Sequence, residues 1–322
     1  VDVDVLSVVG VGDMSGDVFG NGMLLSPHLQ LLAAFDHRHV FLDPCPDPET
    51  SHVERARLFG LRRSSWADYD AGLISGGGGV FPRTAKSIAI TDEVRAALDI
   101  DADVVALRPD DLISAILRAP VDLLWNGGIG TYVKASSESN EAVGDRGNDS
   151  LRVDADELRC RIVGEGGNLG LTQLARVEYA VGGGLIYADA IDNSAGVDCS
   201  DHEVNIKILT GAAIASGALK AGDRNALLAS MTDEVGLKVL AHNYDQTLAV
   251  SLQEDDGPGA LDAQQQFMLW LGARGRLDRK VEGLPGDDVL TQRARVGGAL
   301  ERPELAVVMA YTKMAIYDGL AQ

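Results

Sequence analysis

The chain has 322 residues, of which 46% are hydrophobic, and this is enough apolar material to fill the cores of two ordinary domains. Its 48 acidic residues outnumber 28 Lys and Arg, so the formal charge of -20 argues against nucleic acid as a partner. No run approaches the roughly 18 apolar residues of a membrane-spanning helix and no signal peptide is visible, so we expect a cytoplasmic protein without membrane contact.

The first elements predict a β-α-β unit. Residues Val3 to Gly10 form a continuous apolar run, which is typical of a strand buried on both faces of a parallel sheet. A glycine-rich turn follows, and the leucines of Met23 to Phe35 recur at helical spacing, although Pro27 must disturb that helix. His39 to Asp43 then predicts a short second strand.

Helices and strands continue to alternate up to about residue 200. Further helices are predicted at Thr50 to Phe59, Asp92 to Leu98, Asp110 to Arg118 and Leu171 to Val181. Further strands are predicted at Val121 to Trp125, Cys160 to Val163 and Gly184 to Ala188. This alternation favours a doubly wound, Rossmann-like α/β domain over residues 1–200 with a mostly parallel sheet. Leu73 to Arg83, with four consecutive glycines, is expected to be a loop, and the polar residues 136–150 a surface insertion.

Strand signals vanish after residue 200, so we expect a helical C-terminal region over residues 201–322. Its helices are predicted at His202 to Ala215, Arg224 to Leu240, Tyr244 to Gln253, Leu261 to Leu271 and Glu304 to Leu320. Because the first residue is Val rather than Met and a strand begins almost at once, we also expect the chain to be a piece of a longer protein.

The glycine turn after the first strand carries the strongest local motif, Val9-Gly10-Val11-Gly12-Asp13-Met14-Ser15-Gly16. It is a G-x-G-x-x-x-G variant of the dinucleotide fingerprint. We expect Gly10 to permit a tight exit from the strand, Gly12 to let a pyrophosphate approach the backbone, and Gly16 to let the helix pack closely. Unpaired N–H groups at the helix start would then face the phosphates. With Asp13 inside the turn, these residues form a candidate NAD site.

An acid at the end of the second predicted strand completes this pattern. Asp43 would accept hydrogen bonds from the ribose hydroxyls and repel the 2′-phosphate of NADP. At about 4 Å that repulsion is roughly 1 kcal/mol in water and about 4 kcal/mol at an effective dielectric of 20, which favours NAD. The alternative is that the glycines serve only close packing and that Asp43 caps a turn.

Four blocks of sequence occur in a fixed order along the chain. They are VVGVGDMSGDVFGNG (8–22), VDLLWNGGIGT (121–131), VGEGGNLGLTQLARVEYA (163–180) and AIDNSAGVDCSDHEVNIKI (190–208). Together they resemble the large bacterial NAD-dependent glutamate dehydrogenases. The last two also resemble the E-G-A-N and N-A-G-G-V elements of smaller glutamate dehydrogenases, although Ala195 replaces one glycine.

The resemblance implies an enzyme that converts L-glutamate to 2-oxoglutarate and ammonia by hydride transfer to NAD. It places Asn126 and Asn168 near the nicotinamide, and Val197 and Ser200 in the pocket for the substrate side-chain carboxylate. The family's catalytic Lys and Asp belong to a preceding domain, so no catalytic residue is expected here, and Lys86 matches no catalytic motif. A homo-oligomer is expected for the full-length protein.

Several alternatives stay open. The two asparagines could satisfy local turns, and Ser200 could cap the following helix. The chain could be a non-catalytic NAD-binding or sensing module, or belong to a related amino-acid dehydrogenase.

Metal binding is not expected from the sequence. Cys45, Cys160 and Cys199 lie too far apart for a disulfide framework or a CxxC site. The dense set of potential ligands from Asp198 to Glu203 has the spacing of an acidic helix start rather than of a metal site.

Overall fold

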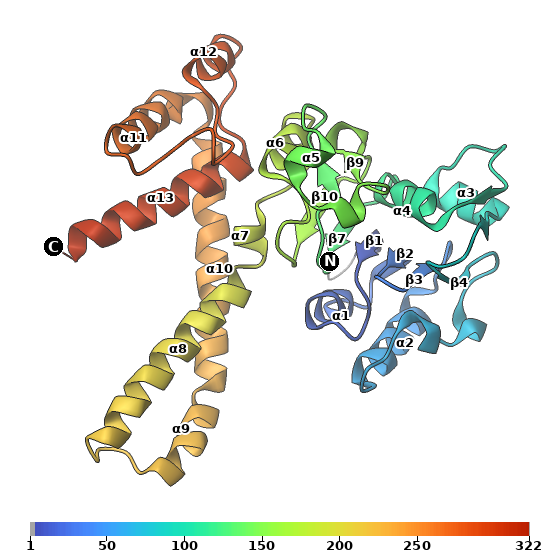
Figure 1. Ribbon diagram of the computed structural model, residues 1–322, viewed down its shortest axis with the longest axis horizontal. Coiled ribbons are helices and arrows are strands. Elements are labelled where there is room, and N and C mark those ends of the chain that lie inside the picture. Colours follow the sequence, from blue (N-terminus) through green and yellow to red (C-terminus); the bar gives the residue numbers. More distant parts are fainter. Residues whose placement is uncertain (1–3, 322) are drawn as a thin grey trace.

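The structure is a computed structural model that describes residues 4–321, and it comprises a mostly parallel six-stranded sheet followed by a helical region (Figure 1). The predicted fold class, an α/β sheet domain followed by helices, is confirmed. Among the described residues, no helix combines the length and the apolar character that crossing a membrane requires.

Four neighbouring parallel strands make up one side of the sheet, whose order is β10-β7-β1-β2-β3-β4. These strands are β1 (Leu6–Val11), β2 (Leu29–Phe35), β7 (Leu123–Asn126) and β10 (Ile162–Glu165). Two antiparallel strands, β3 (His39–Leu42) and β4 (Gly79–Pro82), extend the β2 edge. Val3, with which the first predicted strand begins, lies outside the described residues. The carboxyl ends of the four parallel strands meet at one edge of the sheet.

The segment from Met23 to Phe35 is not the single helix that its leucine spacing predicts. Helix α1 (Asp17–Leu24) ends before Pro27, and β2 takes up the rest of the segment. A short apolar run fits helical and strand periodicity alike, and here pairing with β1 along the length of β2 decides the outcome. The β-α-β unit therefore consists of β1, α1 and β2, and the strand predicted at His39 to Asp43 is an antiparallel addition.

Helices cover both faces of the sheet. On one face, α1 and α2 (Pro48–Gly60) pack on Val8 and Phe41 together with the buried Trp66. On the other, α3 (Asp92–Leu98), α4 (Pro109–Leu117) and α6 (Gln173–Val181) pack on Val9 and Val11. Neighbouring residues of β1 thus face opposite cores, which explains the continuous apolar run that predicted this strand.

Three predicted segments differ in detail from the structure. The four-glycine loop ends in β4, which pairs with β3. The polar segment 136–150 contains α5 (Asn140–Val143) and is held between β8 (Val133–Lys134) and β9 (Val153–Asp154), which pair in parallel. The strand predicted at Gly184 to Ala188 is wrong, because only an isolated bridge between Leu185 and Ile162 forms there.

The helical region is built around one long helix, α10 (Thr232–Asp255) (Figure 1). The helix predicted at Arg224 to Leu240 is divided at Met231, and its second part continues in α10 through the helix predicted at Tyr244 to Gln253. The other helices are α7 (Asp189–Asp192), α8 (Ser194–Ala215), α9 (Arg224–Ser230), α11 (Leu261–Ala273), α12 (Asp287–Arg295) and α13 (Arg302–Leu320). A second core joins Ile191 of α7 to α10, α11 and α13. The predicted division at residue 200 falls inside α8, and a two-domain organisation stays a prediction.

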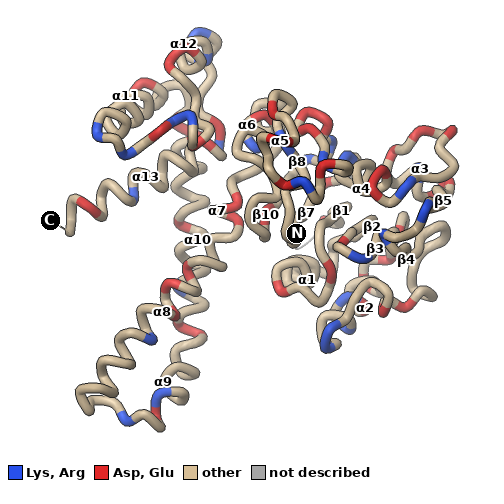
Figure 2. Tube along the Cα trace, viewed as in Figure 1, with Lys and Arg blue, Asp and Glu red and all other residues tan. Residues whose placement is uncertain are grey.

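The hairpin of α8, α9 and α10 exposes much apolar surface. In Figure 2 the charged residues of these helices are separated by uncharged stretches. The exposed side chains include Val204, Ile208, Leu209, Leu237, Leu240 and Tyr244. Exposed apolar side chains in this number on two neighbouring helices are typical of a face that another protein surface covers.

We expect Phe19→Ala to lower the free energy of unfolding by about 3–5 kcal/mol, because the fully buried ring packs edge-on against Trp66 with centroids 5.8 Å apart. Leu25→Ala, on a side chain that is 81% exposed, is the matched control and should change it by less than about 0.5 kcal/mol. Urea unfolding followed by circular dichroism measures both, and equal losses would contradict this packing.

Candidate functional site

Three turns are joined along the carboxyl edge of the sheet. The N–H of Gly12 donates to the carbonyl of Phe35 at 2.8 Å, and the N–H of Gly127 donates to that of Val11 at 2.9 Å. The N–H of Gly167 donates to the carbonyl of Asn126 at 2.9 Å. The glycine turn, the Asn126 loop and the Glu165–Asn168 loop thus form one continuous rim at the edge where open α/β sheets generally bind their ligands.

The sharp turn after β1 is made at Gly12 and not at Gly10. Gly12 has a φ of +137°, which L side chains rarely adopt, whereas Gly10 lies within β1. Both glycines also face Phe19, because an added Cβ would lie 2.6 Å from its ring at Gly10 and 2.7 Å from its Cβ at Gly12. The predicted role of Gly10 in the strand exit is therefore wrong, and its role is to admit Phe19.

Gly16 also differs from its predicted role. A Cβ there would make only an ordinary contact of 3.4 Å, so close packing of the helix does not require this glycine. Gly20 and Gly22 serve that purpose, since a Cβ would lie 2.4 Å from the Phe59 ring or 2.6 Å from Trp125. Gly16 is the N-cap of α1 and makes no side-chain cap, which leaves the first N–H groups of the helix available to an anion.

The acid that follows the second parallel strand is Asp36, which the sequence analysis missed. It comes directly after β2, next to the glycine turn, and its Oδ1 accepts the N–H groups of Arg38 and His39 at 2.7 and 2.6 Å. Its buried Oδ2 has no hydrogen-bond partner among the described residues. Asp36 also lies nearer than Asp43 to the fingerprint's spacing of about 20 residues, a signal that was present in the sequence.

Asp13 and Asp36 form an acid pair that shares the Arg38 guanidinium. Burial raises the pKa of Asp36, and the Asp13 carboxyl adds to this, although the N–H groups of Arg38 and His39 oppose it. Burial also acts to raise the pKa of Asp13, but the hydrogen bonds from Ser15, the neighbouring Asp36 carboxyl and the Arg38 guanidinium outweigh it, so that this pKa lies below its ordinary value. The Arg38 guanidinium lies 3.6 Å from Asp13 and 3.9 Å from Asp36, so two acids already engage the nearest cation.

Asp43 occupies a different environment from the one predicted. It follows β3, an antiparallel strand, and its side chain has no exposed surface. Its Oδ1 accepts the hydroxyl and the backbone N–H of Ser75, and burial raises its pKa. The structure therefore contradicts the placement of Asp43 at the end of the second strand of the β-α-β unit, because β2 takes that position.

Asn126 lies at the end of β7 and is only 2% exposed. Neither its amide oxygen nor its amide nitrogen has a hydrogen-bond partner within residues 4–321. The amide packs directly on Gly170, where an added Cβ would lie 1.9 Å from Nδ2. A buried amide with free donor and acceptor atoms is unusual in a folded protein and is suited to a ligand that carries an amide of its own.

Asn168 connects two of the sequence blocks. Its Oδ1 accepts the Nδ2 of Asn193, the residue that precedes α8, at 2.8 Å. On α10, Asn243 donates to the carbonyl of Ile191 and to the hydroxyl of Ser194, both at 2.8 Å. The start of α8 is thus oriented from both sides, and the exposed Asn168 lies at the rim beside it.

A buried ion pair supports the Glu165–Asn168 loop. Glu165, with no exposed surface, accepts both Nε and Nη2 of Arg176 at 2.6 and 3.0 Å, and Arg176 also contacts Asp189 at 3.1 Å. Asp192 accepts the backbone N–H of Glu165 at 2.9 Å. Burial, followed by the nearby Glu165 charge, raises the pKa of Asp192 to about 7. One arginine therefore faces three carboxyl groups.

The two predicted substrate residues lie on the exposed side of α8. Val197 is 59% exposed and lines a cavity of about 530 Å³ with Asp198, His242 and Lys313. Ser200 is exposed and is not among the residues that line this cavity.

Comparison with known proteins gives a consistent result. Residues 1–253 match the family described as bacterial NAD-glutamate dehydrogenase, catalytic domain. An NAD-specific glutamate dehydrogenase of Pseudomonas aeruginosa is 57% identical over 320 residues, which cover 99% of this chain and 20% of that protein. Proteins of the same name from Mycobacterium tuberculosis and Halomonas elongata are 54% and 52% identical over 97% and 98% of the chain. The chain spans about a fifth of the length of these curated relatives.

We expect the free energy of unfolding of Asp192→Asn, compared with that of wild type, to increase as the pH rises. Because the raised pKa means that the folded state holds a proton the unfolded state has lost, wild-type stability falls between about pH 4 and pH 7 and then levels off. The variant lacks this loss, so its free energy of unfolding relative to wild type should rise by roughly 2 kcal/mol between pH 5 and pH 8.

Urea unfolding at several pH values measures this difference. Asp255→Asn, at an exposed position on α10, is the control and should leave the pH profile unchanged. A difference between Asp192→Asn and wild type that stays constant with pH would show that burial of Asp192 does not affect its titration.

Proposed function

The chain belongs to the family of bacterial NAD-glutamate dehydrogenases, and from this premise we propose that it forms the nucleotide-binding part of such an enzyme. The reaction is the oxidative deamination of L-glutamate to 2-oxoglutarate and ammonia. The observation that carries the proposal is the convergence, at one edge of the sheet, of a glycine turn, an acid pair and a buried unpaired amide. NAD supplies the hydride acceptor, and the protein supplies position and dry surroundings.

The residues present fit a dinucleotide. The turn at Gly12, followed by the uncapped start of α1, offers backbone N–H groups to a pyrophosphate, with Gly10 and Gly16 on either side. The absence of a side chain at Gly127 lets α1 approach this loop closely, because a Cβ there would lie 2.7 Å from the Cα of Phe19. We assign the pyrophosphate to this turn.

We assign the adenosine ribose to Asp36, with Asp13 beside it, in place of Asp43. Oδ2 of Asp36, which has no hydrogen-bond partner among the described residues, can accept a ribose hydroxyl at the end of the parallel strand β2. The buried Oδ2 of Asp43 also has no such partner, so the strand position decides between the two acids. The acid pair would repel a 2′-phosphate, and the nearest guanidinium, Arg38, is already engaged by both acids. This arrangement favours NAD over NADP.

We assign the nicotinamide end to Asn126 and Asn168. The unpaired amide of Asn126 can donate to and accept from a carboxamide, which supports this orientation. Ile129, on the same loop and 97% exposed, offers an apolar surface next to that position. Val197 and Ser200, on α8 beyond the rim, are proposed to contact the substrate side-chain carboxylate, and the catalytic Lys and Asp are proposed to come from outside this chain.

We further propose that the protein acts in the cytoplasm as a homo-oligomer. The free thiols of Cys45, Cys160 and Cys199 fit a reducing compartment. The exposed apolar side chains of α8 and α10 favour burial of this hairpin against another subunit or another part of the enzyme. The excess of acidic residues opposes nucleic acid as a partner.

Titration with NADH and NADPH, followed by nicotinamide fluorescence, tests the ribose assignment. Asp36→Asn should weaken NADH at least about tenfold and reduce the preference for NADH over NADPH, because one negative charge is lost beside the ribose. The amide can still accept the N–H groups of Arg38 and His39, so the turn should persist.

Asp43→Asn is the matched control for this titration. The same chemical change at the buried Asp43 should alter stability without changing the ratio of the two affinities. If Asp43→Asn changes the ratio of the affinities for NADH and NADPH and Asp36→Asn does not, Asp43 rather than Asp36 binds the ribose. If neither cofactor binds the folded wild-type chain, the proposed function of the rim fails.

We expect Ser200→Ala to weaken binding of 2-oxoglutarate to the NADH complex about tenfold while leaving the affinity for NADH unchanged. The reason is the loss of one hydrogen bond to a charged carboxylate, which contributes about 1.5–3 kcal/mol. Calorimetric titration measures both affinities, and Ser216→Ala at the end of α8 is the control. Equal losses for the two ligands would remove the role of Ser200.

A further inference from the structure

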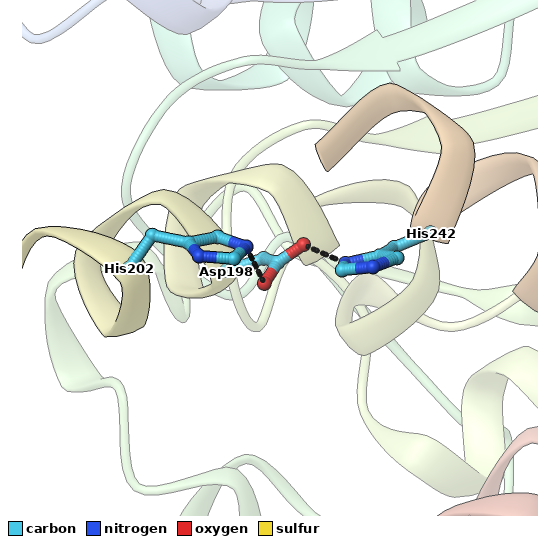
Figure 3. Close-up of side chains that lie close together, drawn as sticks. All are labelled: Asp198, His202 and His242. Atoms are coloured by element: carbon cyan, nitrogen blue, oxygen red, sulfur yellow. Dashed lines mark hydrogen bonds and ion pairs between the residues drawn. The ribbon is translucent and has the colours of Figure 1, made fainter. Parts of the chain in front are cut away.

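Two helices of the C-terminal region bring three potential metal ligands together. Asp198 and His202 lie one turn apart on α8, and His242 approaches them from α10 (Figure 3). Nδ1 of His242 lies 2.7 Å from Oδ2 of Asp198, and Nε2 of His202 lies 3.5 Å from Oδ1. One ligand atom from each residue falls within 4.8 Å of the other two.

This grouping was not visible in the sequence, because the third ligand lies 40 residues further on. Only Asp198 and His202 of the dense set from Asp198 to Glu203 take part in it. Cys199 and Glu203 line a separate groove, where Glu203 is paired with Lys207. The expectation that this segment is an ordinary acidic helix start therefore overlooked the contribution of α10.

The donor set suits a transition metal of the zinc type. Two imidazole nitrogens and one carboxylate oxygen are common ligands of Zn²⁺, and a tetrahedral site with bonds of about 2.0–2.2 Å places its donors roughly 3.3 Å apart. The two imidazole nitrogens lie 2.7 and 3.5 Å from different oxygens of the Asp198 carboxylate, each within about 0.6 Å of that value. The three ligand atoms, which lie within 4.8 Å of one another, would draw together by side-chain rotation to complete the site.

Two further observations point to a cation. Nε2 of His202 is shielded from solvent and has no hydrogen-bond partner among the described residues, so that a metal bond would satisfy it. Asp201 and Asp245 line the cavity beside the cluster, and their carboxylates add negative charge near the three ligands. Lys313, which also lines the cavity, donates to Gln246 at 2.8 Å rather than to Asp198.

We propose that Asp198, His202 and His242 bind one divalent transition metal ion, for which Zn²⁺ is the best-suited candidate. The ion joins α8 to α10 near the end of α8 that Asn193 and Asn243 orient. The neighbouring cavity of about 530 Å³ leaves room for a water molecule as the fourth ligand. The site fixes the part of α8 that carries Val197, and it is independent of the nucleotide rim.

The test uses the 322-residue chain, stripped of metal and titrated with Zn²⁺ in competition with a fluorescent chelator. We expect one equivalent of Zn²⁺ to bind with a Kd below about 1 μM, and Co²⁺ at the same site to give the visible absorption of a tetrahedral complex. Asp198→Asn and His242→Gln should each weaken Zn²⁺ at least about a hundredfold, since each removes a ligand.

Two control variants separate this site from other ligands of the chain. Cys199→Ser removes the exposed thiol next to Asp198, and His37→Gln removes an exposed imidazole near the sheet; both should bind Zn²⁺ as wild type does. Circular dichroism of the metal-free proteins checks that all variants fold. A wild-type affinity no tighter than that of His242→Gln would overturn the proposal and leave a metal-free hydrogen-bonded cluster. Loss of binding in Cys199→Ser would overturn the ligand set.

Discussion

The contact of Phe19 with the strand-end glycines determines the shape of the whole rim. Its ring and backbone lie where a Cβ at Gly10, Gly12 or Gly127 would have to be, so helix α1 approaches β1 and β7 as closely as backbone atoms allow. On its other side the ring meets Trp66, whose indole N–H donates to the carbonyl of Gly12 at 2.9 Å. This packing aims the uncapped start of α1 along the carboxyl edge of the sheet, and the remaining loops join that edge.

The same contact means that the glycines serve packing and ligand approach together. A glycine substitution therefore cannot tell a nucleotide site from a packed turn, because a side chain at Gly12 is excluded by Phe19 and by the backbone angle alike. Groups that the fold leaves unsatisfied are more informative. Among the described residues, the amide of Asn126 has no hydrogen-bond partner, and Oδ2 of Asp36 has only the long ion pair with Arg38 at 3.9 Å. A buried polar atom without a hydrogen-bond partner is costly.

Much of the sheet could be predicted from sequence, because residues buried on both faces give continuous apolar runs, as in β1 and β7. The helix expected at Met23 to Phe35 failed because a short run of leucines fits both periodicities, and only pairing with β1 resolves it. Because of that error, the ribose-binding acid was predicted at Asp43 instead of Asp36. The cluster of Asp198 with His242 depends on how α10 packs against α8, and no local spacing carries that information. Asn126 was identified through its sequence block, although its lack of partners is a property of the fold.

Hydrogen–deuterium exchange of the 322-residue chain, with and without saturating NADH, locates the nucleotide most directly. If the carboxyl edge of the sheet binds NAD, protection should appear at the turn of residues 12–16, at Asp36 and at the loops of residues 127–130 and 166–168, while α11 and α12 stay unchanged. Saturable binding of NADH with protection confined to other segments, or with none at this edge, would contradict the assignment of the rim as the nucleotide site.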